Sequence, residues 1–299
     1  MPPLLTPLDV GGQVDEAAFG RLIEHVLDGG PSGLFVLGTT GEATSLPTHE
    51  KHAVVRYACQ HSAGRIPVLA GLIETSEYAI ESLAGYAADR GVSGLVLTPP
   101  FYLQIQQDEL LAFIERVAPR LPLPVFLYNI PGLTKIPMEP STVLAASGLP
   151  NVVGLKDSSG DLEYLAAIRR TVRRDFLLFC GPEEKLAAAV ALGADGGVSG
   201  GANLFPSFFV HLFAAAARHD TVAVAEMQSV VEEISSEIHN VGASYPAGLK
   251  QAMEEAGVPC GPPAAPVRAV NAGERSRIQA CVRRLMPLVD KLVAKSKER

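Results

Sequence analysis

Three short apolar runs of this sequence end in side chains that are suited to covalent carbonyl chemistry. One run, residues 151–155, is followed by Lys156, a second ends in Tyr128, and a third ends in Thr39-Thr40-Gly41-Glu42. An ammonium at the end of an apolar run is costly to desolvate, so its presence requires an explanation. A lysine amine can form a Schiff base with a carbonyl compound. If the runs are parallel strands, we expect the amine, the phenol and the hydroxyls to meet at one end of a sheet.

Each of these groups also has an ordinary structural interpretation. Lys156 could extend its ammonium to solvent from a strand end, and Tyr128 could pack as an aromatic side chain whose hydroxyl finds any partner. The turn at 39–42 could be a plain tight loop, or its N–H groups could hold a carboxylate. The segment 157–161, Asp-Ser-Ser-Gly-Asp, is typical of a loop and a helix N-cap, which favours a lysine that points into the mouth of a barrel.

Apolar runs bounded by Gly or Pro recur along the chain, each followed by a longer amphipathic stretch. We expect strands at 4–6, 33–38, 66–71, 94–98, 125–128, 152–156, 177–180 and 196–199. Their spacing of roughly 20 to 35 residues is typical of a βα unit. Strands that are apolar throughout are typical of a parallel sheet covered on both faces. Eight such units predict an α/β fold, a closed (β/α)8 TIM barrel.

Helical periods separate and follow these runs. We expect helices at 48–57 (capped by Thr48), 76–90, 108–118, from 182 onward, 222–239, 247–256 and 274–295. A Pro-rich loop at 259–266 separates the last two. The sequence therefore predicts a catalytic barrel over residues 1–220 and a C-terminal helical extension over residues 221–299.

Composition argues against several classes of function. The 299 residues are 47% hydrophobic and 19% charged, an ordinary globular balance, and the net charge of -7 argues against a nucleic-acid partner. No apolar stretch reaches membrane-spanning length, and the first residues lack the basic and apolar regions of a signal peptide. The four cysteines are widely spaced without a CxxC pair, so we expect reduced thiols and a cytoplasmic protein.

The sequence predicts neither a metal nor an organic cofactor. The seven histidines are scattered, and only His49 and His52 share a helical face, which we expect on the outside of the barrel. A zinc-dependent aldolase needs several histidines at strand ends. The glycine-rich segment 196–201 leaves room for a phosphate loop, and so for a phosphate-handling barrel isomerase, but no Walker A or GxGxxG motif is present.

Three motifs, in matching order and spacing, resemble the dihydrodipicolinate synthase / N-acetylneuraminate lyase family of class I, pyruvate-type aldolases. They are Gly38-Thr39-Thr40-Gly41-Glu42, Tyr128-Asn129-Ile130-Pro131 and Gly154-Leu155-Lys156-Asp157, and the resemblance covers nearly the whole chain. It implies a (β/α)8 barrel with a C-terminal helical extension, assembled as a homotetramer from two dimers. Tyr102 matches a tyrosine that members of the family lend to the proton relay of the neighbouring subunit.

The resemblance also implies a role for each motif residue. Lys156 would form the Schiff base with the keto carbon of pyruvate or another 2-keto acid, and Tyr128 would shuttle protons as general acid and base. Thr39 would hydrogen-bond that phenol. Thr40, with backbone N–H groups of the turn that contains Gly41, would hold the carboxylate of pyruvate.

Two departures from the family pattern bear on the substrate. Leu133 stands where dihydrodipicolinate synthases carry an arginine that binds the carboxylate of the aldehyde substrate, and loss of that bidentate contact penalises such a substrate. The segment Gly181-Pro182-Glu183-Glu184 resembles the one with which sialic acid lyases and sugar-acid aldolases contact hydroxyls. An ordinary acidic first turn of a helix explains it equally well. Ser199, at the last strand end, is a further candidate for substrate binding.

We therefore expect a class I aldolase that cleaves or forms a 2-keto-3-deoxy sugar acid, with pyruvate and an aldehyde as the small-molecule partners. The first alternative is dihydrodipicolinate synthase (4-hydroxy-tetrahydrodipicolinate synthase) activity, which condenses pyruvate with aspartate semialdehyde. A dehydratase that uses the same imine and a barrel that binds a keto acid without turnover are further alternatives. The two aldolase activities differ in the aldehyde partner, so a panel of aldehydes tested with pyruvate separates them. Keto-acid binding with no turnover across the panel would favour the protein that only binds.

Overall fold

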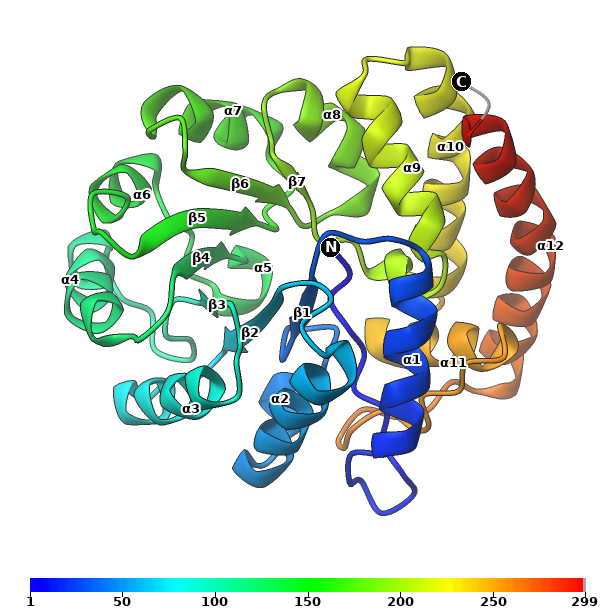
Figure 1. Ribbon diagram of the computed structural model, residues 1–299, viewed down its shortest axis with the longest axis horizontal. Helices are drawn as coiled ribbons and strands as arrows, with labels where there is room; N and C mark the ends of the chain where they lie inside the picture. Colours follow the sequence, from blue (N-terminus) through cyan, green and yellow to red (C-terminus); the bar gives the residue numbers. More distant parts are fainter. Residues whose placement is uncertain (298–299) are drawn as a thin grey trace.

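Seven parallel strands form one sheet whose order follows the chain, as expected of successive βα units (Figure 1). The structure is a computed structural model that describes residues 1–297. The strands are β1 (Leu34–Val36), β2 (Val68–Leu72), β3 (Gly94–Leu97), β4 (Val125–Asn129), β5 (Val152–Asp157), β6 (Leu177–Cys180) and β7 (Gly196–Gly197). Each coincides with one of the expected apolar runs, so the prediction of a parallel α/β barrel is confirmed.

The first residues of the chain fill the eighth position of the barrel without forming a regular strand. Pro3 makes a parallel bridge to Phe35 of β1. On the other side, the amine of Met1 donates to the carbonyl oxygen of Gly197 in β7 at 2.9 Å. The prediction of a strand at 4–6 is wrong, because the prolines that precede it lack N–H groups for a regular ladder. The segment nevertheless contacts both edge strands and closes the barrel.

Helices cover the outside of the sheet (Figure 1). They are α1 (Glu16–Asp28), α2 (Thr48–Ser62), α3 (Glu77–Asp89), α4 (Gln107–Val117), α6 (Pro140–Ala146), α7 (Leu162–Thr171), α8 (Leu186–Ala191) and α9 (Pro206–Ala217). The one-turn helix α5 (Pro131–Thr134) follows β4 and lies inside this ring. Thr48 does not cap α2 as predicted. Pro47 occupies the N-cap position without a side-chain hydrogen bond, and Thr48 is the first helical residue.

Three helices follow the barrel and form the C-terminal extension that the sequence predicts. They are α10 (Thr221–Ile234), α11 (Tyr245–Glu255) and α12 (Ala272–Lys297). A π-helical turn, η5 (Ser235–His239), continues α10. The long helix α12 packs along α9, α10 and α11, and α11 contacts η5 and the short helix η4 (Gly200–Asn203) that follows β7 (Figure 1). The extension therefore reaches back to the carboxyl end of the last strand.

Side chains alternate between the two faces of the sheet and so build two cores. One core lies between the sheet and the helices. The other fills the barrel and consists of Phe35, Leu69, Val96, Phe126, Tyr128 and Val198. Gly154 of β5 leaves room for the Phe126 ring, because a Cβ on this glycine would lie 2.6 Å from the ring. The same alternation places Lys156, two residues beyond Gly154, on the inner face.

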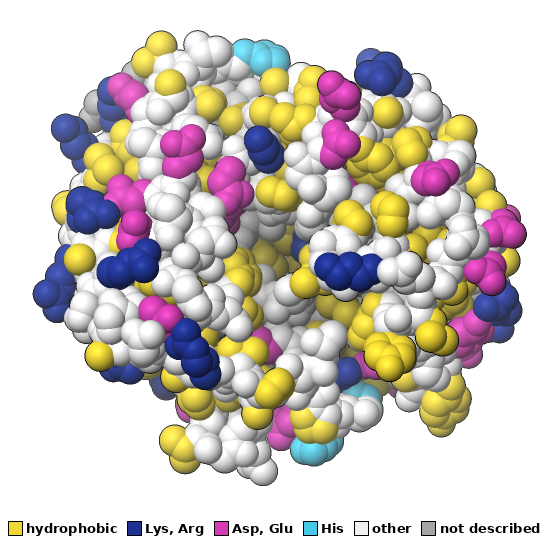
Figure 2. Space-filling model, turned by 180° about the vertical axis from the view of Figure 1, so that it is seen from behind, with side chains coloured by type: hydrophobic (Ala, Val, Ile, Leu, Met, Phe, Trp, Pro, Cys, Tyr) yellow, Lys and Arg dark blue, Asp and Glu magenta, His cyan; other side chains and the backbone are white. Residues whose placement is uncertain are grey.

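The surface shows no single-sign field on the face that Figure 2 displays. Acidic and basic side chains are interspersed there around a central hollow. Within residues 1–297, no helix has the length and apolarity needed to cross a membrane. In the same part of the chain, no three His, Cys, Asp or Glu side chains are grouped so that they could hold a metal ion. All four cysteines are free.

Candidate active site

Tyr128 and Lys156 lie side by side at the carboxyl ends of β4 and β5. They are direct partners in the parallel register of these strands. The Lys156 Nζ atom is 3.9 Å from the centre of the Tyr128 ring and 4.9 Å from the centre of the Phe35 ring. The exposed fraction of Lys156 is only 7%. The amine therefore does not extend to solvent but lies over two aromatic faces, which attract a cation.

The end of β5 is fixed by Asp157, whose side chain points to the opposite face from Lys156. The Asn129 amide donates to Asp157 Oδ1 at 2.7 Å, and the Ser159 hydroxyl donates to Oδ2 at 2.8 Å. As the sequence predicts, Asp161 then caps α7. These bonds hold the strand end from which Lys156 extends.

The Tyr128 phenol is fully buried among polar and charged neighbours. Burial alone would raise its pKa, but the positive charge of Lys156 and hydrogen bonds with Lys156, Thr39 and Ser158 outweigh burial and lower the pKa. A lowered pKa makes the phenolate more accessible near neutral pH. Tyr128 is therefore suited to accept and return a proton.

The turn 38–42 places two threonines at the cavity that contains the Lys156 amine, and two of its backbone N–H groups are unused among the described residues. Thr39 and Thr40 line the same cavity as Lys156, whereas Gly41 lies behind them, with its carbonyl accepting from the Thr6 hydroxyl at 2.7 Å. Within residues 1–297, the backbone N–H groups of Thr40 and Gly41 donate to no other group. Such a turn with unused N–H groups is suited to hold an anion.

The cavity that contains these groups has a volume of about 290 Å³. Lys156, Tyr128 and the two threonines form one side. The acidic segment 181–184 and residues of the C-terminal extension form the other. The extension supplies Ser235, His239, Asn240 and Tyr245. The cavity therefore lies between the barrel and the helices that follow it.

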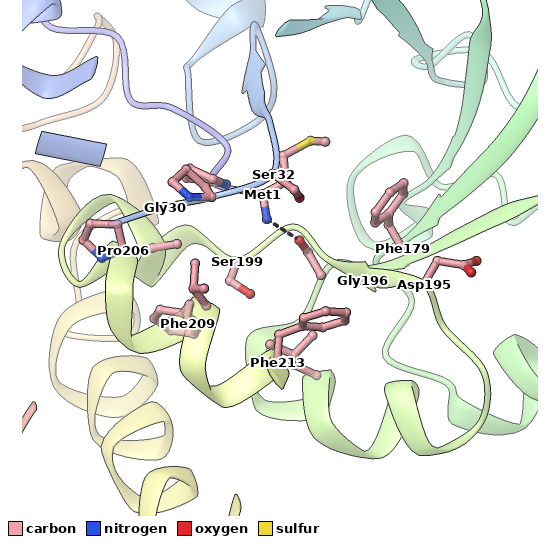
Figure 3. A pocket seen from close by; sticks show the side chains of 16 residues that line it. Met1, Gly30, Ser32, Phe179, Asp195, Gly196, Ser199, Pro206, Phe209 and Phe213 are labelled. Carbon is pink, nitrogen blue, oxygen red and sulfur yellow. Dashed lines mark hydrogen bonds between the residues drawn. The ribbon is translucent and has the colours of Figure 1, made fainter. Parts of the chain in front are cut away.

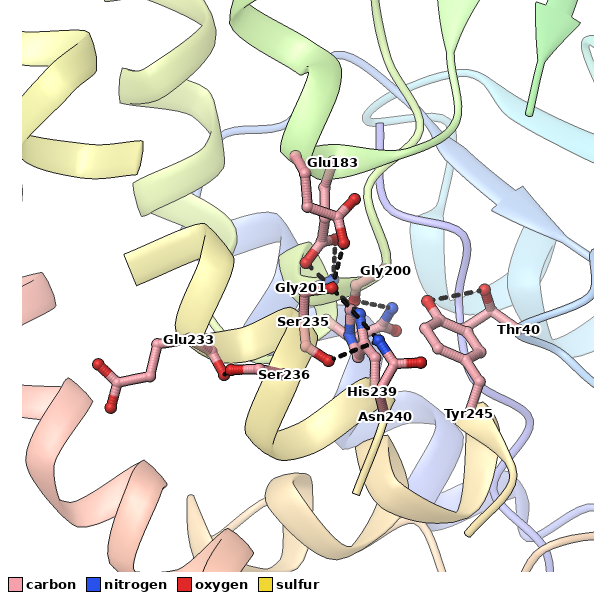
Figure 4. Close-up of polar contacts among 12 residues, drawn as sticks. Thr40, Glu183, Gly200, Gly201, Glu233, Ser235, Ser236, His239, Asn240 and Tyr245 are labelled. Atoms are coloured by element: carbon pink, nitrogen blue, oxygen red, sulfur yellow. Dashed lines mark hydrogen bonds and ion pairs between the residues drawn. The ribbon is translucent and has the colours of Figure 1, made fainter. Parts of the chain in front are cut away.

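His239 stands between Glu183 and Tyr245 (Figure 4), and all three line the cavity that contains Lys156. Glu183 Oε2 accepts from the Gly201 N–H at 2.7 Å, and Oε1 is 3.7 Å from His239 Nδ1. The His239 ring packs edge-on against Tyr245 with ring centres 4.6 Å apart. Among the described residues, neither Glu183 Oε1 nor His239 Nε2 has a hydrogen-bond partner, although both are buried. Buried polar atoms without partners are rare, so these two mark an unsatisfied polar spot behind the cavity wall.

Burial shifts the pKa values of Glu183 and His239 toward their neutral forms. It raises the pKa of Glu183 to about 8 and lowers that of His239 to about 4. At neutral pH the pair is therefore a carboxylic acid beside a neutral imidazole, not an ion pair. Both groups can then donate and accept hydrogen bonds without carrying charge, which suits hydroxyl groups.

The shifted pKa of Glu183 makes stability depend on pH in a defined direction. The pKa of Glu183 is about 8 in the folded protein, above the ordinary 4.5. The contribution of this group to the free energy of unfolding is therefore lost as pH rises from 4.5 through 8. The stabilisation from His239, whose pKa is lowered from 6.5, is lost only as pH falls below that value. Between pH 6.5 and 8 only Glu183 of this pair changes its protonation state. Its ionisation should lower the free energy of unfolding by about 2 kcal/mol.

We therefore expect Glu183→Gln to flatten the dependence of Tm on pH in this range. Wild type should lose roughly 2–4 °C more than the variant between pH 6.5 and 8, measured by calorimetry in matched buffers. Glu274→Gln is the matched control, since Glu274 pairs with Arg268 in the extension and its pKa is lowered to about 2. Parallel curves for wild type and Glu183→Gln would show that Glu183 is already ionised in the folded protein.

Ser199 does not reach this cavity, although the sequence suggests it as a substrate-binding residue. It lines a separate cavity of about 270 Å³, together with Phe179, Phe209 and Phe213 (Figure 3). Because β7 ends two residues earlier and the chain turns into η4, the Ser199 side chain faces α9. We do not retain it as a substrate-binding residue.

Leu133 and Tyr102 also lie outside the cavity that contains the lysine. Leu133 is 60% exposed and lines a neighbouring cavity of about 260 Å³, which shares Thr39 and Ile130 with the first. Tyr102 is 94% exposed and has a φ of 83°. Leu133 therefore lies in the cavity next to the one that contains Lys156. Tyr102 makes no contribution to the site within this chain.

Sequence reasoning missed the residues that the C-terminal extension contributes. His239, Asn240 and Tyr245 lie well beyond the last strand and belong to no motif that the sequence reveals. One weak signal was present. Pro246 stands just inside the start of α11, a position that favours proline.

Comparison with known proteins places the chain in one family. The sequence model of the Dihydrodipicolinate synthetase family matches residues 1–295. The 4-hydroxy-tetrahydrodipicolinate synthase of Oceanobacillus iheyensis is 32% identical over 259 residues, which are 86% of this chain and 87% of that protein. The putative 2-dehydro-3-deoxy-D-gluconate aldolase YagE of Escherichia coli is 30% identical over 275 residues, 89% of this chain and 91% of that protein.

Solved structures agree with this placement. The dihydrodipicolinate synthase of Bacteroides thetaiotaomicron is 40% identical and superposes with a TM-score of 0.91, covering 95% of this chain and 97% of that one. YagE in complex with pyruvate is 28% identical, with a TM-score of 0.90 and coverage of 95% and 97%. The chain therefore belongs to the dihydrodipicolinate synthetase family, and it is a barrel-fold class I aldolase, a pyruvate-dependent carbon–carbon lyase.

Proposed function

We propose that the protein cleaves and forms a 2-keto-3-deoxy sugar acid through a Schiff base between Lys156 and the keto carbon. The observation that supports this most is the composition of the cavity. A buried amine and a phenol of lowered pKa share the cavity with polar side chains that include the acidic pair 183–184, and Glu183 Oε1 and His239 Nε2 have no hydrogen-bond partner among the described residues. One side is suited to imine chemistry and the other to hydroxyls.

The first steps bind the keto acid and activate it. Thr40 and the free N–H groups of its turn hold the carboxylate, which places the keto carbon beside the Lys156 amine. The amine adds to that carbon and water leaves, which gives a protonated imine. The imine withdraws electrons from the adjacent carbon atoms.

The carbon–carbon bond then breaks with transfer of one proton. Tyr128 as phenolate takes the proton of the hydroxyl on carbon 4, and the bond between carbons 3 and 4 breaks. Its electron pair moves into the imine and gives an enamine, while the aldehyde leaves. Carbon 3 takes a proton, and water hydrolyses the imine, which releases pyruvate and restores Lys156. The lowered pKa of the Tyr128 phenol supports this role.

The aldehyde fragment distinguishes the two leading candidate activities. The hydroxyl-binding wall and the putative sugar-acid aldolase among the relatives support a hydroxylated aldehyde. The relatives named 4-hydroxy-tetrahydrodipicolinate synthase support condensation with aspartate semialdehyde as the second candidate. Leu133 offers no charge to the carboxylate of that substrate. For this reason we place the sugar acid first.

An aldehyde panel tests this choice. With pyruvate saturating, kcat/KM for glyceraldehyde should exceed that for propionaldehyde by about tenfold or more, since each hydroxyl gains a hydrogen bond. It should exceed that for aspartate semialdehyde by about 100-fold, because no guanidinium pairs with the carboxylate. Product formation by chromatography measures all three. A preference for aspartate semialdehyde would establish the second candidate instead, and pyruvate binding without any product would identify a protein that only binds keto acids.

His239→Phe provides a matched variant for the panel. It keeps the aromatic contact with Tyr245 but removes both ring nitrogens. We expect about tenfold lower kcat/KM with glyceraldehyde and an unchanged value with propionaldehyde. An equal loss with both aldehydes would mean that His239 supports the site without contacting the hydroxyls.

We also propose that the protein is a cytoplasmic homotetramer in which Tyr102 enters the site of a neighbouring subunit. Tyr102 and Leu103 are 94% and 73% exposed, and exposed apolar side chains mark interaction surfaces. Tyr102 also has a left-handed backbone, which is costly for a residue other than glycine. The free cysteines agree with a reducing compartment.

A further inference from the structure

Glu42 and Lys250 form an ion pair buried behind the turn that lines the cavity. Lys250 Nζ lies 2.6 Å from Glu42 Oε2, and the two side chains are 2% and 3% exposed. Each has a second partner, since the Ala264 N–H donates to Glu42 Oε1 at 2.7 Å and Lys250 donates to the Pro262 carbonyl at 2.8 Å. The pair therefore joins three segments that are distant in sequence. They are the turn 38–42, helix α11 and the loop between α11 and α12.

Helix α11 contacts the same turn a second time, on the cavity side. The Thr40 hydroxyl lies 3.4 Å from the hydroxyl of Tyr245, the first residue of α11 (Figure 4). The Tyr245 hydroxyl also packs directly on Gly200, where a Cβ would be 1.5 Å from it. Farther along α11, a Cβ at Gly248 would lie 2.2 Å from the carbonyl of Ile238 in η5. The helix is thus closely held while it contacts both sides of the turn.

Stability alone is a weak explanation for the ion pair. Removing two charges from water is costly, and apolar side chains of similar volume are often as stabilising or more so. What the pair does provide is one defined arrangement, because both charges are satisfied only in that geometry. Glu42 also has a φ of 58°, a left-handed backbone conformation that is strained in a residue other than glycine. The pair can hold the turn in this conformation.

We propose that Glu42 and Lys250 are positioning residues for the keto acid. Their ion pair holds Thr40 and the free N–H groups of the turn where the carboxylate binds, although neither residue lines the cavity. This inference rests on the proposed role of Thr40 in holding that carboxylate. Through this ion pair, the C-terminal extension would help to bind the keto acid.

The test is the neutral double variant Glu42→Gln/Lys250→Met, which leaves no unpaired buried charge. We expect it to fold, with a circular dichroism spectrum like that of wild type and a Tm within a few degrees. KM for pyruvate should rise by about 10- to 100-fold, because small displacements of a binding group have effects of this size. kcat at saturating pyruvate should fall by less than about threefold, since Lys156 and Tyr128 remain in place.

Two further variants complete the design. Arg268→Met/Glu274→Gln removes an ion pair from the same extension that does not contact the turn, so KM for pyruvate should stay at the wild-type value. Lys250→Arg keeps the positive charge, so its KM for pyruvate should stay within about threefold of the wild-type value. If the neutral double variant does not fold, Glu42→Asp is measured in its place. It keeps the charge on a shorter side chain and should raise KM.

The outcomes separate a positioning role from a structural one. A merely structural role would lower the active fraction, and so kcat per total protein, while KM stays constant. Wild-type KM in a folded double variant, or in folded Glu42→Asp, would overturn the inference. If borohydride traps no pyruvate adduct on wild type, the proposed function itself fails, and that result is independent of the comparison between variants.

Discussion

Lys156→Ala is expected to lower turnover by about 10⁴-fold or more, because it removes the amine that is proposed to bind the keto acid covalently. In the part of the chain that the structure describes, Lys156 is the one amine that lines the cavity. Wild-type protein treated with pyruvate and borohydride should carry a reduced adduct on the peptide that contains Lys156. The variant should carry none, as judged by mass spectrometry.

The fold should survive this substitution, since it removes a buried amine instead of creating an unpaired charge. We expect Tm of Lys156→Ala to equal or exceed that of wild type. Lys135→Ala is the matched control, because Lys135 is exposed and its amine donates to the Gly132 carbonyl at 2.6 Å. It should keep full activity and the adduct. Turnover by folded Lys156→Ala, or an adduct that maps to another lysine, would contradict the mechanism.

Tyr128→Phe is expected to lower kcat by about 10²- to 10⁴-fold, the range for loss of a general acid and base. The ring that lies under the Lys156 amine remains, so the imine should still form, although more slowly. The lowered pKa of the wild-type phenol predicts that kcat rises with pH as the phenolate forms. That rise should be absent in the variant. Steady-state rates across pH and the rate of borohydride trapping measure the two effects.

Tyr164→Phe is the matched control for the loss of a buried tyrosine hydroxyl. Among the described residues, the Tyr164 hydroxyl is buried without a hydrogen-bond partner, and burial raises its pKa. Tyr164 does not line the cavity. Its removal should leave kcat and its pH dependence unchanged and Tm equal or higher. If Tyr128→Phe behaves like this control, another group transfers the proton.

The barrel was predictable because its signal is local. Each strand is a short apolar run with Gly or Pro at its ends, and parallel strands place the ends of such runs at one edge. The partnership of Tyr128 and Lys156 follows from that rule once both runs are strands. The segment at 4–6 failed because its neighbouring prolines remove ladder donors, while its place between β1 and β7 depends on contacts far along the chain.

The far wall of the site was not predictable in the same way. Glu183 was recognisable because it follows a strand within a resembling segment, but its raised pKa depends on burial by residues distant in sequence. His239 lies in a π turn, where the side chains leave the helical period, so periodicity gives no sign of where it points. Ser199 shows the opposite error. It stands near a strand end, but the local turn directs its side chain to the other cavity.

The closure of the barrel by the first residues has a consequence for the order in which the protein folds during synthesis. The Asn203 amide donates to the Pro3 carbonyl at 2.8 Å and accepts from the Leu5 N–H at 3.1 Å, across about 200 positions of sequence. A ribosome adds roughly 5–20 residues per second, so the first segment waits about ten seconds or longer for its partners. The ion pair between the turn 38–42 and Lys250 can form only later, once Lys250 has been synthesised. The binding site is therefore complete only after almost the entire chain has emerged, and a truncated chain would fold without a finished site.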